Sequence, residues 1–227
     1  QKWWPGDSSF EVIVGAILTQ NTNWGNVEKA LNNLKKEKLL TPEHLVKISH
    51  RELANLIKPA GYFNVKAKRL KNFLDFLDER YDGDLKAMSK APTIKLREEL
   101  LSINGIGPET ADSILLYAFQ KPIFVIDAYT QRILYRHGLA DKKTKYEALQ
   151  EIFTKNLNPK TDLYNEFHAL IVKIGKDYCK PKPKCEQCPL NKVNYSLESR
   201  CNKCFRHFNS DESSTKNKDT LICKECL

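Results

Sequence analysis

The chain lacks cysteine over most of its length, has a single methionine and has no long apolar run. Its first 178 residues contain no cysteine, which excludes disulfides from most of the sequence. No apolar run approaches the roughly twenty residues that a membrane-spanning helix needs, so we expect a soluble, cytoplasmic protein. The only methionine is Met88 and the chain opens on Gln1, so we expect these residues to lack the native start and a first helix.

What the chain has in excess is positive charge. Lys and Arg number 37 against 28 for Asp and Glu, which gives a formal net charge of +9. This balance favours a polyanionic partner, for which basic side chains supply affinity that falls steeply with salt. Basic residues concentrate at 66–71 and 173–184. A solvated lysine-rich surface gives the same counts, so charge alone does not decide in favour of a nucleic acid.

Apolar residues repeat at three and four positions through most of the chain, which is typical of amphipathic helices. No alternating pattern of strands precedes the tail, residues 195–227, so we predict an all-α fold of one large domain or of two lobes with a tail. None of the histidines singled out stands at metal-ligand spacing, and we expect core or surface roles for His44, His50, His137 and His168. The expected helical segments are residues 10–18, 27–34, 45–57, 67–77, 96–101, 114–119, 133–139, 146–157 and 163–174.

A glycine-rich turn, Gly105-Ile106-Gly107-Pro108, interrupts the helical pattern. Proline at the first position of a helix gives up only an N–H that has no partner, so a helix is predicted to begin at Pro108. Glycine tolerates positive φ and the close approach of another backbone, and the N–H groups at a helix start attract anions. The turn therefore suits a phosphate, although a tight turn between packed helices would have the same sequence.

An aspartate follows this turn by one helix. The apolar run at residues 123–126 leads directly to Asp127, after which a helical pattern resumes. Asp127 is therefore predicted to cap the N-terminus of a helix. A catalytic role is compatible with capping, because a carboxylate at a helix N-terminus stays ionised and fixed in position.

The glycine turn and its trailing aspartate resemble the helix-hairpin-helix motif of the endonuclease III superfamily of base-excision DNA glycosylases. Residues 10–22 resemble the family's early core helix with its glutamine segment, and residues 61–67 resemble its second DNA-contacting loop. The opening Trp3-Trp4-Pro5-Gly6 and residues 19–24 look closest to the branch related to 3-methyladenine DNA glycosylases. Most of residues 8–190 can be laid on the family in order.

The resemblance implies two helical lobes with DNA and an extruded base between them. Residues 1–19 plus 131–178 would form one lobe and residues 20–130 the other, with the helix-hairpin-helix motif at about 96–119. Double-stranded DNA with a damaged base is then the expected partner, and we expect a monomer.

The resemblance also implies roles for single residues. Asp127 matches the aspartate that activates water or stabilises the cationic sugar. Inserted side chains help to offset the cost of extruding a base. The matching DNA contacts are Gln20, which fills the gap left by the flipped nucleotide, Tyr62, which presses into the opposite strand, Asn64 and Lys66 in the second loop, and Gly105, Ile106, Gly107 and Thr110 at the hairpin. An aromatic base pocket is expected in the 3-methyladenine branch, and Trp24 is its candidate wall; core packing is the alternative for this tryptophan.

One departure from the family is informative. In members that also cut the backbone, a lysine two residues beyond the loop forms a Schiff base with the sugar, whereas this chain has Glu109 there. A carboxylate cannot form that imine, so we predict a monofunctional glycosylase that leaves an abasic site. Glu109 then lines the base pocket or orients water, or else it is a first-turn glutamate favoured by the helix dipole. The sequence offers no obvious proton donor for the departing base. An alkylated purine is already cationic and leaves with little acid catalysis, so we expect an alkylated purine as the substrate base.

The cysteines are confined to the last quarter of the chain. An odd number clustered in this way indicates metal binding rather than disulfides. The first three lie where endonuclease III relatives carry a [4Fe–4S] cluster, and the last four have zinc-ribbon spacing. The residues are Cys179, Cys185, Cys188, Cys201, Cys204, Cys223 and Cys226.

Seven cysteines do not suffice for two sites of four thiolates each. Either Cys201 or Cys204 completes the cluster across an insertion, or the cluster lacks one thiolate and His207 is a possible substitute ligand. We favour an iron–sulfur loop at residues 179–194 with three cysteines and a zinc-binding tail at residues 195–227.

Two alternatives from other classes stay open. A non-catalytic module that recognises damaged DNA would need no chemistry at Asp127. A glycosylase for uracil, mismatched or oxidised pyrimidines with abasic-site lyase activity would need an amine near Asp127, and Lys121 is the candidate.

Overall fold

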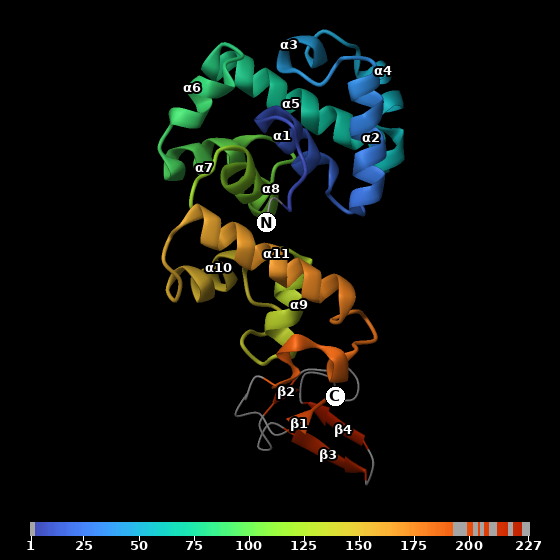
Figure 1. The fold of residues 1–227 in the computed structure, drawn as a ribbon, viewed down its shortest axis with the longest axis vertical. Helices are drawn as coiled ribbons and strands as arrows, with labels where there is room; N and C mark the ends of the chain where they lie inside the picture. Colours follow the sequence, from blue (N-terminus) through green and yellow to red (C-terminus); the bar gives the residue numbers. More distant parts are fainter. Residues whose placement is uncertain are drawn as a thin grey trace. The chain divides into compact units, whose positions relative to one another are not determined.

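The computed structural model describes residues 3–192 and, in the tail, residues 199–201, 204, 207–208, 213–217 and 220–223. The chain divides into two compact units, Gln1–Ile123 and Phe124–Leu227. Figure 1 draws the first unit in blue to green and the second in yellow-green to red.

The first unit is helical. Polar side chains set the start of several helices, because Ser8, Asn23 and Ser49 each accept a hydrogen bond from a backbone N–H in the following first turn, as N-cap residues do. Its elements are α1 (Ser9–Leu18), α2 (Trp24–Lys36), α3 (Pro42–Leu45), α4 (His50–Leu56), η1 (Lys58–Ala60), α5 (Phe63–Tyr81), α6 (Leu85–Lys90), α7 (Thr93–Ser102), α8 (Pro108–Ser113) and the π-helical turn η2 (Ile114–Ala118).

Helix α1 is the centre of this first unit. Every residue from Phe10 to Leu18 is buried, which is the pattern of a helix enclosed by others. The helix contacts α2, α5, α8 and η2. Its one buried charge, Glu11, pairs with Lys35 at 2.6 Å. The residues that directly follow α1 therefore start from a fixed position beside α8.

The second unit begins with an extended segment, residues 124–126, and continues with α9 (Ala128–Arg136), α10 (Tyr146–Thr154), α11 (Thr161–Asp177), η3 (Cys185–Gln187) and η4 (Pro189–Lys192). Its core is aromatic. The ring of Phe124 stacks on that of Phe153 with centroids 4.0 Å apart, and it meets Tyr164 and Phe167 edge to face at 5.3 and 6.0 Å. Such ring pairs add to the stabilisation that burial provides, so the chain is anchored immediately before Asp127.

Two pairs of antiparallel strands occur in the described part of the tail. β1 (Ser199–Arg200) pairs with β2 (His207–Phe208), so that Ser199 is opposite Phe208. β3 (Ser213–Asn217) pairs with β4 (Thr220–Cys223) with an irregularity between Ser213 and Thr215.

The predicted all-helical body is confirmed, since within the described residues strands occur only in the tail. The prediction of one helix at residues 45–57 is wrong: α3 ends at Leu45, and Ser49 caps a new helix, α4. Residues 114–118 form a π-helical turn instead of a regular helix. None of the helices described is at once long and apolar enough to span a membrane.

Residues 1–19 fall in the first unit, where α1 packs among α2, α5, α8 and η2. The lobe division expected from the family, which joins residues 1–19 to 131–178, stays a prediction.

Candidate functional site

The hairpin predicted from the glycine turn is present between α7 and α8. Pro108 occupies the first position of α8, as predicted. Gly105 has a φ of +96°, a conformation that residues with a Cβ rarely adopt. Gly107 has an ordinary φ of −96°, so the backbone requires only one of the two glycines. Ile103 and Ile106 are buried and fix the turn to the core beneath it.

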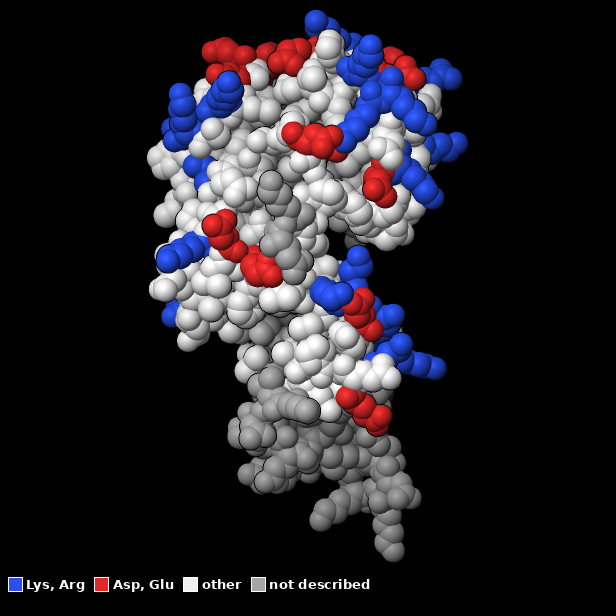
Figure 2. Space-filling view, viewed as in Figure 1, with Lys and Arg blue, Asp and Glu red and all other residues white. Residues whose placement is uncertain are grey.

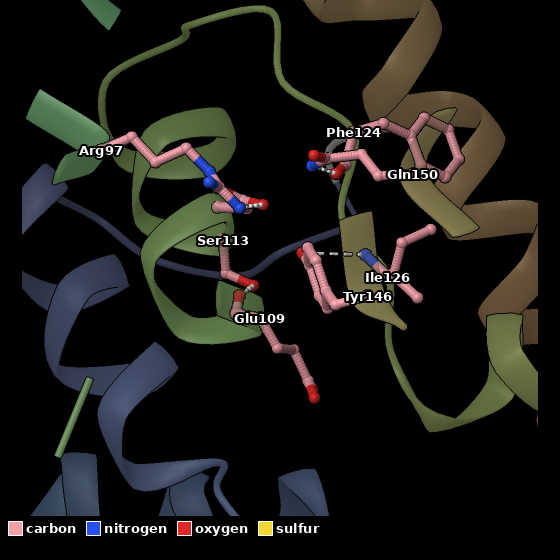
Figure 3. A network of polar contacts seen from close by, with 8 residues as sticks. Arg97, Glu109, Ser113, Phe124, Ile126, Tyr146 and Gln150 are labelled. Atoms are coloured by element: carbon pink, nitrogen blue, oxygen red, sulfur yellow. Dashed lines mark hydrogen bonds and ion pairs between the residues drawn. The ribbon is translucent and has the colours of Figure 1, made fainter. Parts of the chain in front are cut away.

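An ion pair joins the two helices of the hairpin. Arg97, on α7, donates to both carboxylate oxygens of Asp112, on α8, at 2.7 and 3.1 Å, and Asp112 is fully buried. Figure 3 shows the side chain of Arg97 extended toward the helix that carries Ser113. A two-point contact of this kind constrains direction as well as distance. The hairpin is therefore held in one geometry whatever binds to its loop.

Gln20 lies against the loop of the hairpin. Its Nε2 donates to the Gly105 carbonyl and to the Thr110 hydroxyl, both at 3.0 Å. Its Oε1 accepts from Nη1 of Arg69. Thr110 is buried, so this predicted DNA contact serves in the described structure to hold Gln20.

The second loop presents an exposed aromatic ring. Tyr62 is 72% exposed and has a left-handed φ of +45° directly before α5. For a residue with a Cβ this conformation costs roughly 1–2 kcal/mol. Such strain persists where the surrounding fold enforces it, and it is often found at binding sites. Asn64 is also exposed, and its carbonyl lies 3.0 Å from Nε2 of His50.

Lys66 does not fit its predicted place in the DNA contact. Its side chain is 1% exposed, and its Nζ donates to the carbonyls of Leu18 and Ala60 at 2.8 and 2.7 Å. Burial and the nearby charge of Arg69 lower the pKa of Lys66 to about 8. The ammonium thus closes the C-terminal end of α1 from inside the fold, and a phosphate cannot reach it there.

The basic segment at residues 66–71 therefore presents less charge to solvent than its composition suggests. Nζ of Lys71 donates to three carbonyls of the chain around α3, those of Leu45, Val46 and Ile48, at 2.9, 2.8 and 2.5 Å. Figure 2 shows basic side chains over the visible face of the first unit with acidic ones among them. Of this segment, Lys68 is exposed and Arg69 is half-buried.

Asp127 caps α9, as predicted. Its Oδ1 accepts a hydrogen bond from the Thr130 N–H at 2.7 Å and another from the Thr130 hydroxyl at 2.8 Å. The side chain of Asp127 is 12% exposed. The carboxylate is thus nearly enclosed and held through one oxygen, while the other oxygen is directed elsewhere.

The other oxygen of Asp127 faces a histidine. Oδ2 lies 3.6 Å from Nε2 of His168 on α11, and His168 is 2% exposed. Burial raises the pKa of Asp127, but the electrostatic influence of His168 and the hydrogen bonds from Thr130 outweigh it, so the pKa lies below its ordinary value. Asp127 is therefore a carboxylate at neutral pH in spite of its burial. The sequence predicted a core or surface role for His168 and did not predict this contact.

Two side chains of α10 hold the segment that leads to Asp127. The Tyr146 hydroxyl accepts from the Ile126 N–H at 3.2 Å, and Nε2 of Gln150 donates to the Phe124 carbonyl at 2.5 Å; both contacts are visible in Figure 3. Tyr146 and Gln150 are four residues apart, so they share one face of the helix. Hydrogen bonds thus hold one N–H and one carbonyl of the backbone that leads to Asp127.

Helices α9 and α11 approach closely at Gly175. A Cβ at this position would lie 2.4 Å from Cδ1 of Tyr129, so a larger residue does not fit. Arg132 donates to the carbonyls of Cys179 at 2.7 Å and of Gly175 at 3.1 Å. These contacts set the position of α9, and through it that of Asp127, relative to His168.

Glu109 lies in the first turn of α8 and is exposed. Its backbone carbonyl accepts from the Ser113 hydroxyl at 2.7 Å. Figure 3 shows its carboxylate pointing away from Arg97. Glu109, which stands where the resemblance leads one to expect a lysine, is therefore on the surface of the hairpin.

Trp24 belongs to a group of four aromatic residues. Its ring meets that of Trp4 edge to face at 5.5 Å, and Trp4 stacks on Tyr117 at 4.7 Å with an angle of 19°. Trp3 meets Trp4 at 5.7 Å and Tyr117 at 5.9 Å. Trp3, Trp4 and Trp24 are half-buried. Sequence reasoning missed Tyr117, because it is far from the tryptophans along the chain.

The cysteines of the described residues do not form a metal-binding group. Within those residues no three His, Cys, Asp or Glu side chains converge on a position for an ion. Cys179 and Cys201 are buried, and Cys185, Cys188 and Cys204 are half-buried. Burial raises the pKa of Cys188. The side chain of Cys223 and all of Cys226 lie outside the described residues, as does the side chain of His207.

Two cysteines contact the last turn of α9. Nη1 of Arg136 lies 3.4 Å from Sγ of Cys179, and the Tyr135 hydroxyl lies 3.2 Å from Sγ of Cys204. The N–H of Cys204 in turn lies 3.5 Å from Sγ of Cys201. The sulfur atoms of Cys179, Cys201 and Cys204 are thus each within reach of a protein donor.

Comparison with known proteins gives consistent matches. Residues 14–159 match the family described as HhH-GPD superfamily base excision DNA repair protein. A candidate DNA repair glycosylase of Methanocaldococcus jannaschii is 52% identical over 192 residues, which cover 84% of this chain and 87% of the relative. Endonuclease III of Thermotoga maritima is 34% identical over 180 residues, or 79% of each chain.

A solved structure has the same fold. The 3-methyladenine DNA glycosylase (MagIII) of H. pylori, bound to 1,N6-ethenoadenine, matches with a TM-score of 0.67 and 31% identity. The match covers 77% of this chain and 88% of that one.

Proposed function

This chain belongs to the HhH-GPD superfamily of base excision DNA repair proteins and is a DNA glycosylase, and from that premise we propose that it removes alkylated purines by hydrolysis. The observation that carries the proposal is Asp127. It is a nearly enclosed carboxylate whose pKa is held below the ordinary value, and the sequence resemblance matches it to the family's catalytic aspartate.

The reaction breaks the bond between the sugar C1′ and the base nitrogen. The bonding electron pair leaves with the base, which neutralises the positive charge of an alkylated purine. The sugar becomes cationic, and a fixed negative charge beside it stabilises this transition state more than the ground state. A water oxygen then bonds to C1′, and its proton passes to the Asp127 carboxylate. For a cationic base no further acid is required, since the departing base needs no proton.

The positions of the candidate amines support the absence of lyase activity that we propose. Glu109 replaces the lysine that forms a Schiff base in other members, and a carboxylate cannot do so. The Lys66 ammonium is enclosed between two carbonyls, and Nζ of Lys121, the candidate amine named above, donates to the Ala91 carbonyl at 2.7 Å. We therefore infer an intact abasic site as the product.

The aromatic group supports a cationic or extended purine as the substrate. Indole and phenol faces attract cations, and Trp4, Trp24 and Tyr117 bring three such rings together. The MagIII relative was solved with 1,N6-ethenoadenine, an enlarged purine. We propose that the damaged base stacks within this group, with Trp24 as one wall.

DNA binding is assigned to the two loops of the first unit. In the proposal, the hairpin at Gly105–Gly107 receives a phosphate, Gln20 fills the gap left by the flipped nucleotide, and Tyr62 enters the opposite strand. The exposure of the Tyr62 ring and the position of Gln20 beside the hairpin support these roles. Lys66 is excluded from the interface by its burial.

The test uses oligonucleotide duplexes that each contain a single lesion. The protein is expected to generate alkali-dependent breaks at 3-methyladenine, 7-methylguanine or 1,N6-ethenoadenine, and not at uracil, thymine opposite guanine or oxidised pyrimidines. Sodium borohydride should trap no covalent adduct. A trapped adduct would refute the monofunctional mechanism, and activity confined to pyrimidines would refute the substrate class.

A pair of variants tests the base pocket. Trp24→Ala should lower excision of a cationic base by about tenfold, because a cation over an aromatic face is worth roughly 1–2 kcal/mol when desolvated. Trp24→Phe should retain most of the activity. Equal effects of both variants on cationic and neutral bases would indicate that Trp24 only packs.

The metal sites remain a proposal from spacing alone. Cys179, Cys185 and Cys188 would hold an iron–sulfur cluster, and the four distal cysteines would hold zinc. Either metal would stabilise the tail and take no part in base removal. Visible absorbance together with iron and zinc analysis of the purified protein tests both assignments.

A further inference from the structure

Arg69 lies across the loop of the hairpin. Its side chain comes from α5, and a Cβ on Gly105 would lie 2.3, 2.8 and 2.9 Å from its Cγ, Cδ and Nε. Its Nη1 donates to Oε1 of Gln20. Within the part of the chain that the structure describes, Arg69 forms no ion pair with an acidic residue. Its guanidinium is therefore committed to Gln20 and the hairpin loop.

The contact with Arg69 determines which way the Gln20 amide points. Nε2 of Gln20 donates to the Gly105 carbonyl and to the Thr110 hydroxyl, while its oxygen faces the guanidinium. Rotation of the amide by half a turn would set its NH2 group against the donors of Arg69, and its oxygen against the carbonyl of Gly105. Only one orientation satisfies all three neighbours.

We propose that Arg69 is a positioning residue, which holds the gap-filling side chain Gln20 oriented at the hairpin before DNA binds. This inference rests on the proposed function, in which Gln20 enters the gap left by the flipped nucleotide. A flexible side chain that becomes ordered only on binding weakens affinity by roughly three- to tenfold. Arg69 removes that loss in advance, because Gln20 is already ordered beside the loop that receives the strand.

The geometry requires arginine at this position. The planar guanidinium presents several donors in a fixed fork, whereas lysine ends in a single rotatable ammonium. Lys68, the next residue toward the N-terminus of α5, is exposed and carries the same charge. It therefore offers a matched control for electrostatic effects.

The experiment compares DNA that has a gap to fill with DNA that has none. Fluorescence anisotropy measures affinity for a duplex with a central tetrahydrofuran abasic analogue and for the same strand alone, at one salt concentration. The proteins are wild type, Arg69→Met, Arg69→Lys, Gln20→Ala, the double variant Arg69→Met with Gln20→Ala, and Lys68→Met. Thermal unfolding verifies that each variant is folded, and Arg69→Lys provides the comparison if Arg69→Met is not.

We expect Arg69→Met to weaken duplex binding by three- to tenfold and single-strand binding by less than twofold. In the Gln20→Ala background the same change should have no further effect, and Arg69→Lys should behave as Arg69→Met. Lys68→Met should weaken both DNAs equally and independently of Gln20.

A penalty that persists without Gln20, or that is equal for both DNAs, would show that Arg69 contacts DNA directly and would overturn the proposal. Failure of the proposed function is a different result, namely intact binding with no alkali-labile product from any lesion. Absence of binding to both DNAs would overturn both.

Discussion

Oδ1 of Asp127 accepts two hydrogen bonds from Thr130, from its N–H at 2.7 Å and from its hydroxyl at 2.8 Å. One residue thus supplies both donors that hold this oxygen. The capping function is met by Oδ1 alone. Oδ2 faces Nε2 of His168, and in the proposed function it is the oxygen that acts on the sugar. An amide at position 127 would keep the cap, because Asn and Asp are equally good N-cap residues. Capping and catalysis can therefore be separated by substitution.

Asp127→Asn is expected to lower the single-turnover excision rate by about 10²- to 10³-fold, the usual effect of losing one preorganised electrostatic group. The variant should stay folded, since the cap is retained, and its melting temperature should fall only by the contribution that the charge of the carboxylate makes to stability. Asp162→Asn is the control, because Asp162 is an exposed aspartate in the first turn of α11, and it should leave the rate unchanged. An unchanged excision rate in Asp127→Asn would contradict the catalytic role proposed for Asp127.

Stability should depend on pH through Asp127. Its pKa is lower in the folded protein than in the unfolded chain, so the ionised carboxylate stabilises the fold above the unfolded value of about 3.9. This contribution is lost as the pH falls through the lowered folded pKa. Urea unfolding of wild type and Asp127→Asn should give free energies that differ most near neutral pH and converge in acid. A difference that is constant with pH would contradict the assignment.

Lys66→Met should destabilise the protein without weakening DNA binding. Removal of the ammonium leaves the Leu18 and Ala60 carbonyls without their donor, which costs about 2 kcal/mol or more in the free energy of unfolding. Lys68→Met should change that free energy by no more than about 0.5 kcal/mol. The affinity of folded Lys66→Met for DNA should equal that of wild type. A loss of affinity with a shallower salt dependence would place Lys66 on a phosphate after all.

Gly105→Ala and Gly83→Ala separate backbone strain from the contact with Arg69. Both glycines have positive φ, +96° and +75°, so alanine at either position costs roughly 1–2 kcal/mol of stability. Only at Gly105 would the new methyl group displace Arg69, because nothing lies within 4 Å of a Cβ at Gly83. Gly105→Ala should therefore weaken duplex binding by about tenfold, and Gly83→Ala should not. Equal binding by both variants would contradict this.

Local signals in the sequence were sufficient for the hairpin and for the cap. Gly105, Pro108 and Asp127 each act on the backbone within a few residues, so their roles can be read from neighbours in the chain. The burial of Lys66 can also be predicted from the helical spacing of its neighbours. Lys66 lies four residues before Leu70 and seven before Phe73, on the buried stripe of α5, and that register places its side chain inside.

Other features depend on contacts between distant parts of the chain. Gln20 and Arg69 are 49 residues apart, and Trp4 and Tyr117 are separated by more than half of the first unit. Helical periodicity predicts which face of a helix is buried, but it does not predict which element packs against that face. The contact of His168 with Asp127 is of the same kind, because the pattern of α11 indicates a core position and leaves its neighbour open.

The absence of a side chain at Gly175 limits which substitutions the protein tolerates at this position. The separation of α9 and α11 sets the position of the Asp127 carboxylate relative to His168. That separation depends on the ring of Tyr129, which fills the space that a methyl group at position 175 would take. An added methyl group at position 175, two helical turns along α11 from His168, would shift Asp127 and His168 relative to each other. In the proposed function, the placement of the Asp127 carboxylate thus depends on a glycine in the neighbouring helix.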